Sequence, residues 1–406
     1  MSPLEGISIL DLSHVAPGSF CTMILADLGG EVTRIESPVQ GRSLGIRRSA
    51  SPEDGKGKIR EALYDPLRRN KRSIAINLKS DVGREIFYRI AKRSDVIVEG
   101  FRPGVVERLK IDYKTISKIN QRIIYCSLSG YGQEGPYRDL SGHDITYLSM
   151  SGVLSLIGSG KGPPIVPLNI VADIAGASQY AALGIMAALI ARGKTEKGQY
   201  IDQSFTDGAL SLIPAFTQSY FLNGVVPGRG ESALQGAYPY YGVYETKDGK
   251  FISIACIESF FWENLCRALD KEEYAVHCFS PEHYFHKPKD NKWKEIRSWL
   301  TSVFLTKTRD EWFDYLPKKD IPIGKVYTLE EALCDKQLVE REMVVEIDHP
   351  DEGKVKQVGC PIKLSETPAT VRSLSPFFGQ HTNEILLKNG FSQDRINEFY
   401  ADDIVA

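Results

Sequence analysis

The first 130 residues alternate between short apolar runs and segments with helical spacing, and this alternation restricts the possible folds more than any other feature. The apolar runs have the length of buried strands and lie at residues 7–12, 31–36, 73–78, 95–99 and 122–128. Between them, apolar residues recur at the period of a helix. Strands that alternate with helices build a parallel sheet that is covered on both faces. We therefore predict an α/β fold with a mostly parallel, doubly wound, Rossmann-like large domain.

Ligands of such sheets bind beyond the carboxyl ends of the strands. In this chain those ends are residues 13–17, 99–102 and 129–132, which should line one crevice. The first β-α-β unit lacks the GxGxxG pattern of dinucleotide sites. We therefore interpret it as an ordinary α/β unit rather than as an NAD site.

The sequence pattern changes after Gly228. Two apolar runs flank Asp248-Gly249, a pair typical of β-hairpin turns, and helical segments follow. We predict a large domain over residues 1–203 that is completed by about 340–406, a helical linker over 204–229, and a small α+β domain over 230–330.

Composition excludes several classes of partner. The net charge of −2 gives no global basic field, so we expect no nucleic acid and no membrane as partner. Seven cysteines without a CxxC pair are typical of reduced thiols, and no signal peptide is recognisable, so we expect a cytoplasmic location. We expect no metal, because the nearest ligand cluster lacks a common zinc spacing; its members are His277, Cys278, His283 and His286.

Residues 40–70 are polar and have no apolar period, which predicts a long surface loop. The segment carries the basic pairs Arg47-Arg48 and Arg68-Arg69. Two interpretations stay open: these cations lie in a solvated loop, or they form an electrostatic clamp for a polyphosphate ligand.

The clearest chemical signal is a histidine, His143, followed thirty residues later by a carboxylate, Asp173. Histidine exchanges protons near neutral pH, and a carboxylate does so when burial raises its pKa. The pair could move protons at a carbon that lies between them. Alternatively, Asp173 could attack an acyl carbon, or His143 could be structural and Asp173 a helix N-cap.

Several stretches resemble one protein family. They include LEGISILDLSHVAPGSF from residue 4, SDVIVEGFRPGVVERL at 94–109, GHDITYLSMSGVLS at 142–155 and PLNIVADIAG at 167–176. The chain resembles the family III CoA-transferases over nearly its whole length, and within them the α-methylacyl-CoA racemase branch. The Asp of ADIAG is shared by the superfamily and is the nucleophile in transferases, whereas the His of GHD marks the racemase branch.

The resemblance implies proton transfer by His143 and Asp173 at the carbon α to a CoA thioester, through an enolate held by backbone N–H groups near Asp173. It implies a third catalytic residue, Glu258, which supports His143 across a domain or subunit boundary. It implies coenzyme A as part of the substrate, no prosthetic group, and an interlocked homodimer. The residues it places against CoA are Ala75, Ile76, Asn77, Leu78, Glu99, Gly100, Phe101, Arg102, Arg108, Gly142, Asp144, Ile145, Thr146 and Tyr147.

The chain also departs from the racemase pattern. Ser37 stands where racemases often have arginine, and Gln235 stands where they have aspartate. We therefore keep three hypotheses. The first is a racemase or epimerase of 2-methyl-branched acyl-CoA, the second is a CoA-transferase that forms a thioester on Asp173, and the third is a CoA-thioester-binding protein without catalysis.

Overall fold

The structure is a computed structural model that describes residues 1–38 and 63–406. These residues form two compact units, the first made of 1–147, 169–211 and 333–406, and the second of 148–168 and 212–332. The domain boundaries predicted above stay a prediction.

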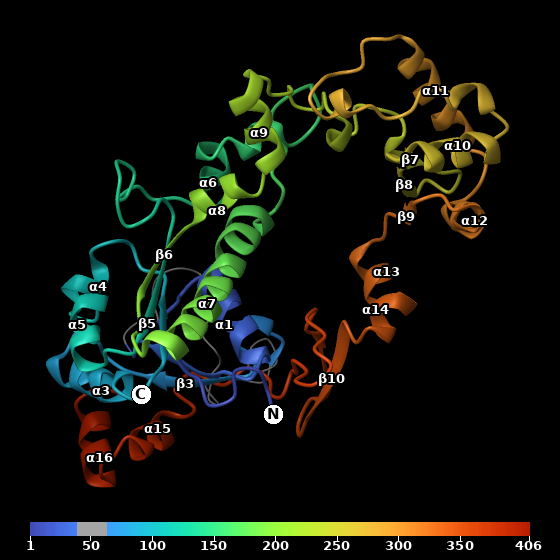
Figure 1. The fold of residues 1–406 in the computed structure, drawn as a ribbon. Helices are drawn as coiled ribbons and strands as arrows, with labels where there is room; N and C mark the ends of the chain where they lie inside the picture. The colour runs from blue at the N-terminus through green and yellow to red at the C-terminus, as the bar shows by residue number, and fades with distance from the viewer. Residues whose placement is uncertain (39–62) are drawn as a thin grey trace. The chain divides into compact units, whose positions relative to one another are not determined.

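A six-stranded parallel sheet forms the centre of the first unit (Figure 1). Its strands are β1 Ser8–Asp11, β2 Glu31–Glu36, β3 Lys71–Ala75, β4 Val96–Glu99, β5 Ile124–Ser129 and β6 Tyr200–Ser204. The spatial order is β3-β2-β1-β4-β5-β6, with every neighbouring pair parallel. This is the doubly wound arrangement, and it confirms the predicted fold class.

Helices cover the sheet of the first unit. On one side α1 Ala16–Asp27 packs against a π-helix, Ile170–Gln179, and against its continuation, α7 Tyr180–Thr195. On the other side lie α3 Asp81–Ala91, α5 Tyr113–Ile119, α15 Thr382–Lys388 and α16 Gln393–Ala401, whose apolar residues share one core cluster. The remaining elements of the unit are α4 Val105–Arg108, α6 Asp144–Met150, α8 Phe205–Ser211, α14 Lys336–Glu340 and the hairpin of β10 Val344–His349 and β11 Gly353–Val358.

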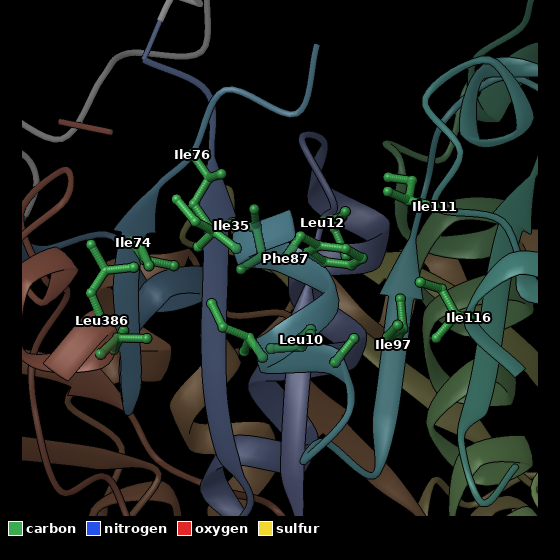
Figure 2. Close-up of a cluster of buried hydrophobic side chains, with 14 of the residues drawn as sticks. Leu10, Leu12, Ile35, Ile74, Ile76, Phe87, Ile97, Ile111, Ile116 and Leu386 are labelled. Atoms are coloured by element: carbon green, nitrogen blue, oxygen red, sulfur yellow. The ribbon is translucent and has the colours of Figure 1, made fainter. Parts of the chain in front are cut away.

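Figure 2 shows a cluster of buried hydrophobic side chains on one face of the sheet. Side chains along a strand alternate between the two faces, so every second residue of a strand joins this cluster. Leu10 and Leu12 lie two residues apart on β1 and just past its end, so both point to the face covered by α3. Phe87 of α3 and Leu386 of α15 are fully buried against that face. Each such side chain contributes roughly 1.5–3 kcal/mol on burial, so residues 382–405 stabilise the sheet although they come last in the sequence.

Buried ion pairs hold the other side of the sheet to the helix that follows β1. The Lys71 ammonium lies 3.0 Å from the Asp11 carboxylate, and both side chains are fully buried. The Arg69 guanidinium lies 2.6 Å from Asp27, and Arg68 lies 2.8 Å from Glu36. Arg68 and Arg69 are therefore committed to carboxylates of the fold and are not free to clamp a polyphosphate. Arg47-Arg48, the other pair of that hypothesis, lies outside the described residues.

The second unit is an α+β structure, as predicted. Its antiparallel sheet consists of β7 Tyr241–Glu245, β8 Phe251–Ala255 and β9 Ile323–Lys325. The expected hairpin joins β7 to β8, and Gly249 adopts a φ of +71° that favours glycine in the turn. Its main helices are α9 Pro214–Asn223, α10 Ser259–Ala268, α11 Lys292–Phe304 and α12 Arg309–Tyr315, and α13 Leu329–Leu333 leads back to the first unit.

One helical run of the described residues, 170–195, is long and apolar enough to cross a membrane by length and composition alone. Its mean hydropathy is 1.6, and 39% of the apolar window is buried. The run contacts α1 and α8 within the first unit. Core helices of globular proteins pass the same test, so the expectation of no membrane partner stays a prediction.

A histidine is built into the aromatic core of the second unit. The ring of His283 stacks on Tyr238 at 4.1 Å, and its Nδ1 accepts hydrogen bonds from the Tyr240 hydroxyl and the Ser280 N–H. Because Nδ1 accepts from a backbone N–H, the imidazole is neutral and carries its proton on Nε2. Burial lowers the pKa of His283, with an opposing effect from Glu282.

This environment predicts a pH dependence of stability. Unfolded histidine has a pKa of about 6.5, so as the pH falls the unfolded chain binds a proton before the folded His283 does. The free energy of unfolding should therefore decrease from about pH 6.5 downward. In His283→Phe, which keeps a ring in the stack, thermal unfolding should depend less steeply on pH between 7 and 5. Equal slopes in the two proteins would contradict this role of His283.

Candidate active site

His143 and Asp173 lie in the crossover between β5 and β6. His143 precedes α6, and its carbonyl accepts the N–H of Thr146 at 2.8 Å. Asp173 is the fourth residue of the π-helix. The sequence analysis had the helix beginning after Asp173, with that residue as a possible N-cap, and this was wrong. The N-cap position belongs to Asn169, because the helix begins at Ile170.

Asp144 connects the two segments. One of its carboxylate oxygens, Oδ2, accepts the backbone N–H groups of Ala172 and Asp173, each at 2.9 Å. Asp144 is almost completely buried, and within the described residues its other oxygen, Oδ1, makes no hydrogen bond. The residue next to His143 therefore caps the helix that carries Asp173, so the two candidate groups are held in a fixed relation.

The Asp173 carboxyl group is a weaker acid than an ordinary aspartate. Burial and the negative charge of Asp144 raise its pKa to about 6, while Asn169 and His143 act in the opposite direction. The Asn169 amide lies 3.5 Å from Oδ2 of Asp173, which is long for a hydrogen bond. His143 is exposed, yet it is close enough for its charge to act on Asp173. A carboxyl group with this pKa can accept or donate a proton near neutral pH.

The π-helix is fixed by close backbone contacts. Its Gly176 packs against Gly208 of α8. A Cβ added at Gly208 would lie only 1.7 Å from the Gly176 carbonyl oxygen. The Ser178 hydroxyl donates a hydrogen bond of 2.6 Å to the carbonyl of Asp173. The amide of Gln203 donates to the Gly176 carbonyl at 3.2 Å. Small residues in α8 and in the π-helix therefore allow the approach that positions the turn around Asp173.

Tyr147 links Asp173 to the predicted CoA-binding residues. Burial, together with the charge of Asp173, raises the pKa of Tyr147 to about 12, and Arg102 opposes this. The tyrosine ring is packed edge-on against Tyr131 and Phe205. Gly142 allows this packing, because a Cβ there would lie 2.5 Å from the Tyr147 ring. Arg102 and Asp173 thus act on one phenol from different elements.

A cavity of about 60 Å³ opens beyond the carboxyl ends of β1, β2 and β3. Its lining residues are mostly apolar and comprise Leu12, His14, Ile35, Glu36, Ser37, Ile76, Asn77, Leu78, Lys79, Phe101 and Leu109. Four of the residues expected to contact CoA are among them: Ile76, Asn77, Leu78 and Phe101. Two of the three strand ends predicted to line one crevice contribute to this cavity, through His14 and Phe101, whereas residues 129–132 do not line it.

The other residues expected to contact CoA lie on nearby elements. Ala75 ends β3, Arg108 ends α4, and Gly100 and Arg102 lie in the segment between β4 and α4. Glu99 is buried at the end of β4, where its carboxylate accepts the Phe101 N–H at 2.8 Å. Burial raises the pKa of Glu99 to about 7. Glu99 therefore orders the turn that carries Phe101. Of the α6 residues, Ile145 is exposed, and the Thr146 hydroxyl donates to the carbonyl of His143.

Glu258 belongs to the second unit. It occupies the N-cap position of α10, and its carbonyl accepts the Phe261 N–H. Its side chain is exposed. Its proposed partnership with His143 stays a prediction. Within residues 1–38 and 63–406, no three His, Cys, Asp or Glu side chains are grouped as ligands of a metal ion.

The sequence analysis missed two polar residues. Asn169 lies one helical turn before Asp173, and that spacing was a usable signal. His14 lines the cavity and packs edge-on against Phe101, with ring centroids 5.0 Å apart. His14 belongs to residues 13–17, which were predicted to line the crevice, although its side chain was not singled out.

The fold and the site together define the class of protein: an α/β protein that holds a carboxyl group of raised pKa and a histidine in one crossover of a parallel sheet. The family follows from comparison. A family model described as CoA-transferase family III matches residues 4–382, and the chain belongs to this family.

Relatives are similar over nearly the whole chain. Human alpha-methylacyl-CoA racemase is 35% identical over 402 residues, which cover 99% of this chain and 97% of that protein. The beta subunit of succinyl-CoA–L-malate CoA-transferase from Chloroflexus aurantiacus is 30% identical, with coverages of 99% and 98%. A CAIB/BAIF family protein from Brucella suis has a TM-score of 0.78 at 26% identity, covering 96% of this chain and 99% of that one. Racemases and CoA-transferases are thus both among the relatives.

The geometry around Asp173 predicts the effect of one substitution. Asp144→Asn removes the negative charge that helps to raise the pKa of Asp173, so this pKa should fall from about 6 toward 3.8. The pKa can be read from a carbon-13 NMR titration of labelled carboxyl groups, with the Asp173 signal identified by its loss in Asp173→Asn.

Asp139→Asn is the matched control, because Asp139 is an exposed carboxylate of the same loop that pairs with Arg138. The control should leave the Asp173 titration unchanged. An unchanged titration in Asp144→Asn as well would show that Asp144 does not set the acidity of Asp173.

Proposed function

We propose that the protein is a racemase or epimerase of 2-methyl-branched acyl-CoA thioesters. The observation that carries this proposal is the raised pKa of Asp173, about 6, together with the proximity of His143, whose charge acts on the Asp173 carboxyl group. A histidine beside a carboxyl group of raised pKa suits the removal and return of a proton at one carbon.

The proposed reaction conserves protons. For one enantiomer, neutral His143 takes the α-proton while the C–H electron pair moves into the thioester to form an enolate. Protonated Asp173 then delivers its proton to the other face of the α-carbon. The product state, with His143 charged and Asp173 ionised, is the starting state for the opposite enantiomer. Each well-placed acid or base typically contributes about 10²–10⁴-fold to the rate.

The enolate oxygen needs hydrogen-bond donors. The N–H groups of Ala172 and Asp173 already donate to Asp144, so the donors expected near Asp173 are other groups. The amide of Asn169 fits this role, because its contact with Asp173 is long and, within residues 1–38 and 63–406, its side chain donates no other hydrogen bond. Other first-turn N–H groups of the π-helix would complete the set.

Coenzyme A would bind across the carboxyl edge of the sheet. The cavity beside Ile76 and Phe101 suits the apolar parts of the cofactor portion of the substrate. The charges of Arg102 and Asp173 both act on the pKa of Tyr147, so Arg102 lies near the proposed catalytic carboxyl group. A CoA molecule bound at Arg102 would therefore place its thioester end near Asp173. No prosthetic group takes part in the proposed reaction, since the acid and the base are both side chains of the protein.

A CoA-transferase is the second candidate. The similarity to succinyl-CoA–L-malate CoA-transferase supports it, since that relative covers 99% of this chain. In this reaction Asp173 would attack the thioester carbonyl, form a mixed anhydride and release CoA. CoA would then attack the Asp173 carbonyl, expel the donor carboxylic acid and leave an aspartyl thioester, which passes CoA to a second carboxylic acid. His143 has no assigned role in that chemistry, and so the racemase is preferred.

One incubation separates the two reactions. The protein is mixed with 2-methylacyl-CoA in D2O without an acceptor acid, and deuterium at the α-carbon is followed by mass spectrometry. The racemase should incorporate one deuterium with loss of optical activity, and Asp173→Asn should slow the loss of optical activity by about 10²-fold or more. No exchange, together with an Asp173 thioester that hydroxylamine cleaves, would establish the transferase instead.

We further propose that the protein works as a cytoplasmic homodimer. Three consecutive residues near the end of α9, Tyr220, Phe221 and Leu222, are exposed by 57–82% and suit burial against a second copy. In the proposed dimer, Glu258 of one subunit supports His143 of the other. Such sharing makes the site incomplete in a single chain.

Subunit mixing tests the shared site. His143→Ala and Glu258→Gln should each be inactive alone, but a heterodimer of the two contains one site with both native residues. Mixing after partial denaturation should therefore restore up to about half of the native activity in each heterodimer. If Glu258 acts on His143 of its own chain, every site in the mixture carries a defect and no activity returns. Each variant mixed with itself is the control.

A further inference from the structure

Residues 404–406 lie along the outer edge of β3. This strand is the outermost in the order of the six-stranded sheet, so among the described residues no further strand of the sheet pairs with its other side. Val405 partly fills this place, because it forms an antiparallel bridge with Ile76, the residue that follows β3. Val405 also belongs to the apolar cluster of the sheet, so packing holds the pairing together with hydrogen bonds.

The backbone N–H groups at the end of β3 alternate in direction, as they do in any extended chain. The Ile76 N–H points inward and donates to a carbonyl of β2 at 2.8 Å. The Asn77 N–H points outward and donates to the Ile404 carbonyl at 2.8 Å. The Ala75 N–H also points outward and donates to the Thr382 hydroxyl at 3.2 Å. Residues from the last part of the sequence therefore hold the outer side of this segment.

Thr382 joins the two outer contacts. Its side chain is fully buried, and its hydroxyl accepts the Ala75 N–H while it donates to the Ala406 carbonyl at 2.7 Å. One hydroxyl thus connects the end of β3 to residues 404–406. Its removal would leave the buried Ala75 N–H without this partner, which is costly.

The chain reaches the edge of β3 through a reversal that follows α16. Asp403 has a φ of +54°, in the left-handed region that aspartate adopts more readily than most residues. The Ile404 N–H then donates to the Phe399 carbonyl at 2.9 Å, which closes the turn. The conformation of Asp403 therefore directs residues 404–406 along β3.

We propose that Thr382 and residues 404–406 are positioning elements for acyl-CoA, because they hold residues 75–78 in the shape that receives the ligand. This inference rests on the proposed function, in which residues 75–78 contact CoA. Ile76, Asn77 and Leu78 line the cavity beyond β1, β2 and β3. A segment that is already ordered loses less conformational freedom on binding, so the ligand binds more tightly. The family model ends at residue 382 and does not describe residues 404–406.

Thr382→Val tests the hydroxyl, because valine has nearly the same shape. The dissociation constant of CoA, measured by calorimetry, should rise about three- to tenfold, as expected for one lost hydrogen bond. Thr382→Ser restores a hydroxyl and should bind CoA nearly as the wild-type protein does. The kcat of α-proton exchange at saturating acyl-CoA should stay within about twofold of the native value, because a positioning role in binding acts on KM.

Hydrogen exchange of backbone amides reports on the segment directly. In Thr382→Val, amides of residues 73–79 should exchange about tenfold faster, while those of β1 and β5 keep the native rate. Asp403→Val strains the turn after α16 and should have the same local effect. Asp403→Gly allows the positive φ and should not.

Thr246→Val is the matched control, because Thr246 is a buried threonine beside the β7–β8 turn whose hydroxyl is also hydrogen-bonded. It should change neither CoA affinity nor exchange at residues 73–79. Equal CoA affinities of wild type and Thr382→Val would overturn the inference and leave the proposed function intact. Equal weakening in the control would overturn it too, since a general loss of stability would then explain the effect. Absence of CoA binding to the wild-type protein would overturn the proposed function, and the inference with it.

Discussion

The hydrogen bonds from the N–H groups of Ala172 and Asp173 to Asp144 are the contact on which the site depends. They join the segment that begins with His143 to the helix that carries Asp173, across a connector of almost thirty residues. The same carboxylate raises the pKa of Asp173 by its charge. A single buried side chain thus helps to fix the position of the proposed catalytic carboxyl group and adds to the effect of burial, which is the larger cause of its raised pKa.

The fold was largely predictable, because alternating strand and helix patterns specify a parallel sheet and its carboxyl edge. The site was predictable only in part. His143 and Asp173 were found from their chemistry, but no local pattern showed that the helix begins at Ile170 or that its first turns are π-helical. That geometry depends on backbone contact between Gly176 and Gly208, which are 32 positions apart and belong to different elements.

The basic residues around position 70 show the same limit. By composition, Arg68 and Arg69 could have met a phosphate, yet each is paired with a buried carboxylate of the sheet or of α1. Removing one partner of such a pair leaves a buried charge and is costly, so these arginines stabilise the fold. Partner geometry, and not residue type, therefore identifies these arginines as structural groups.

The central claim is that His143 and Asp173 act on opposite faces of one carbon. It is tested most directly by deuterium exchange from D2O into each pure enantiomer of a 2-methylacyl-CoA, measured with His143→Ala and with Asp173→Asn. The account predicts that each variant still exchanges the α-proton of one enantiomer, and that the two variants retain opposite enantiomers. Equal exchange of both enantiomers by either variant would contradict the account, because one group would then serve both faces.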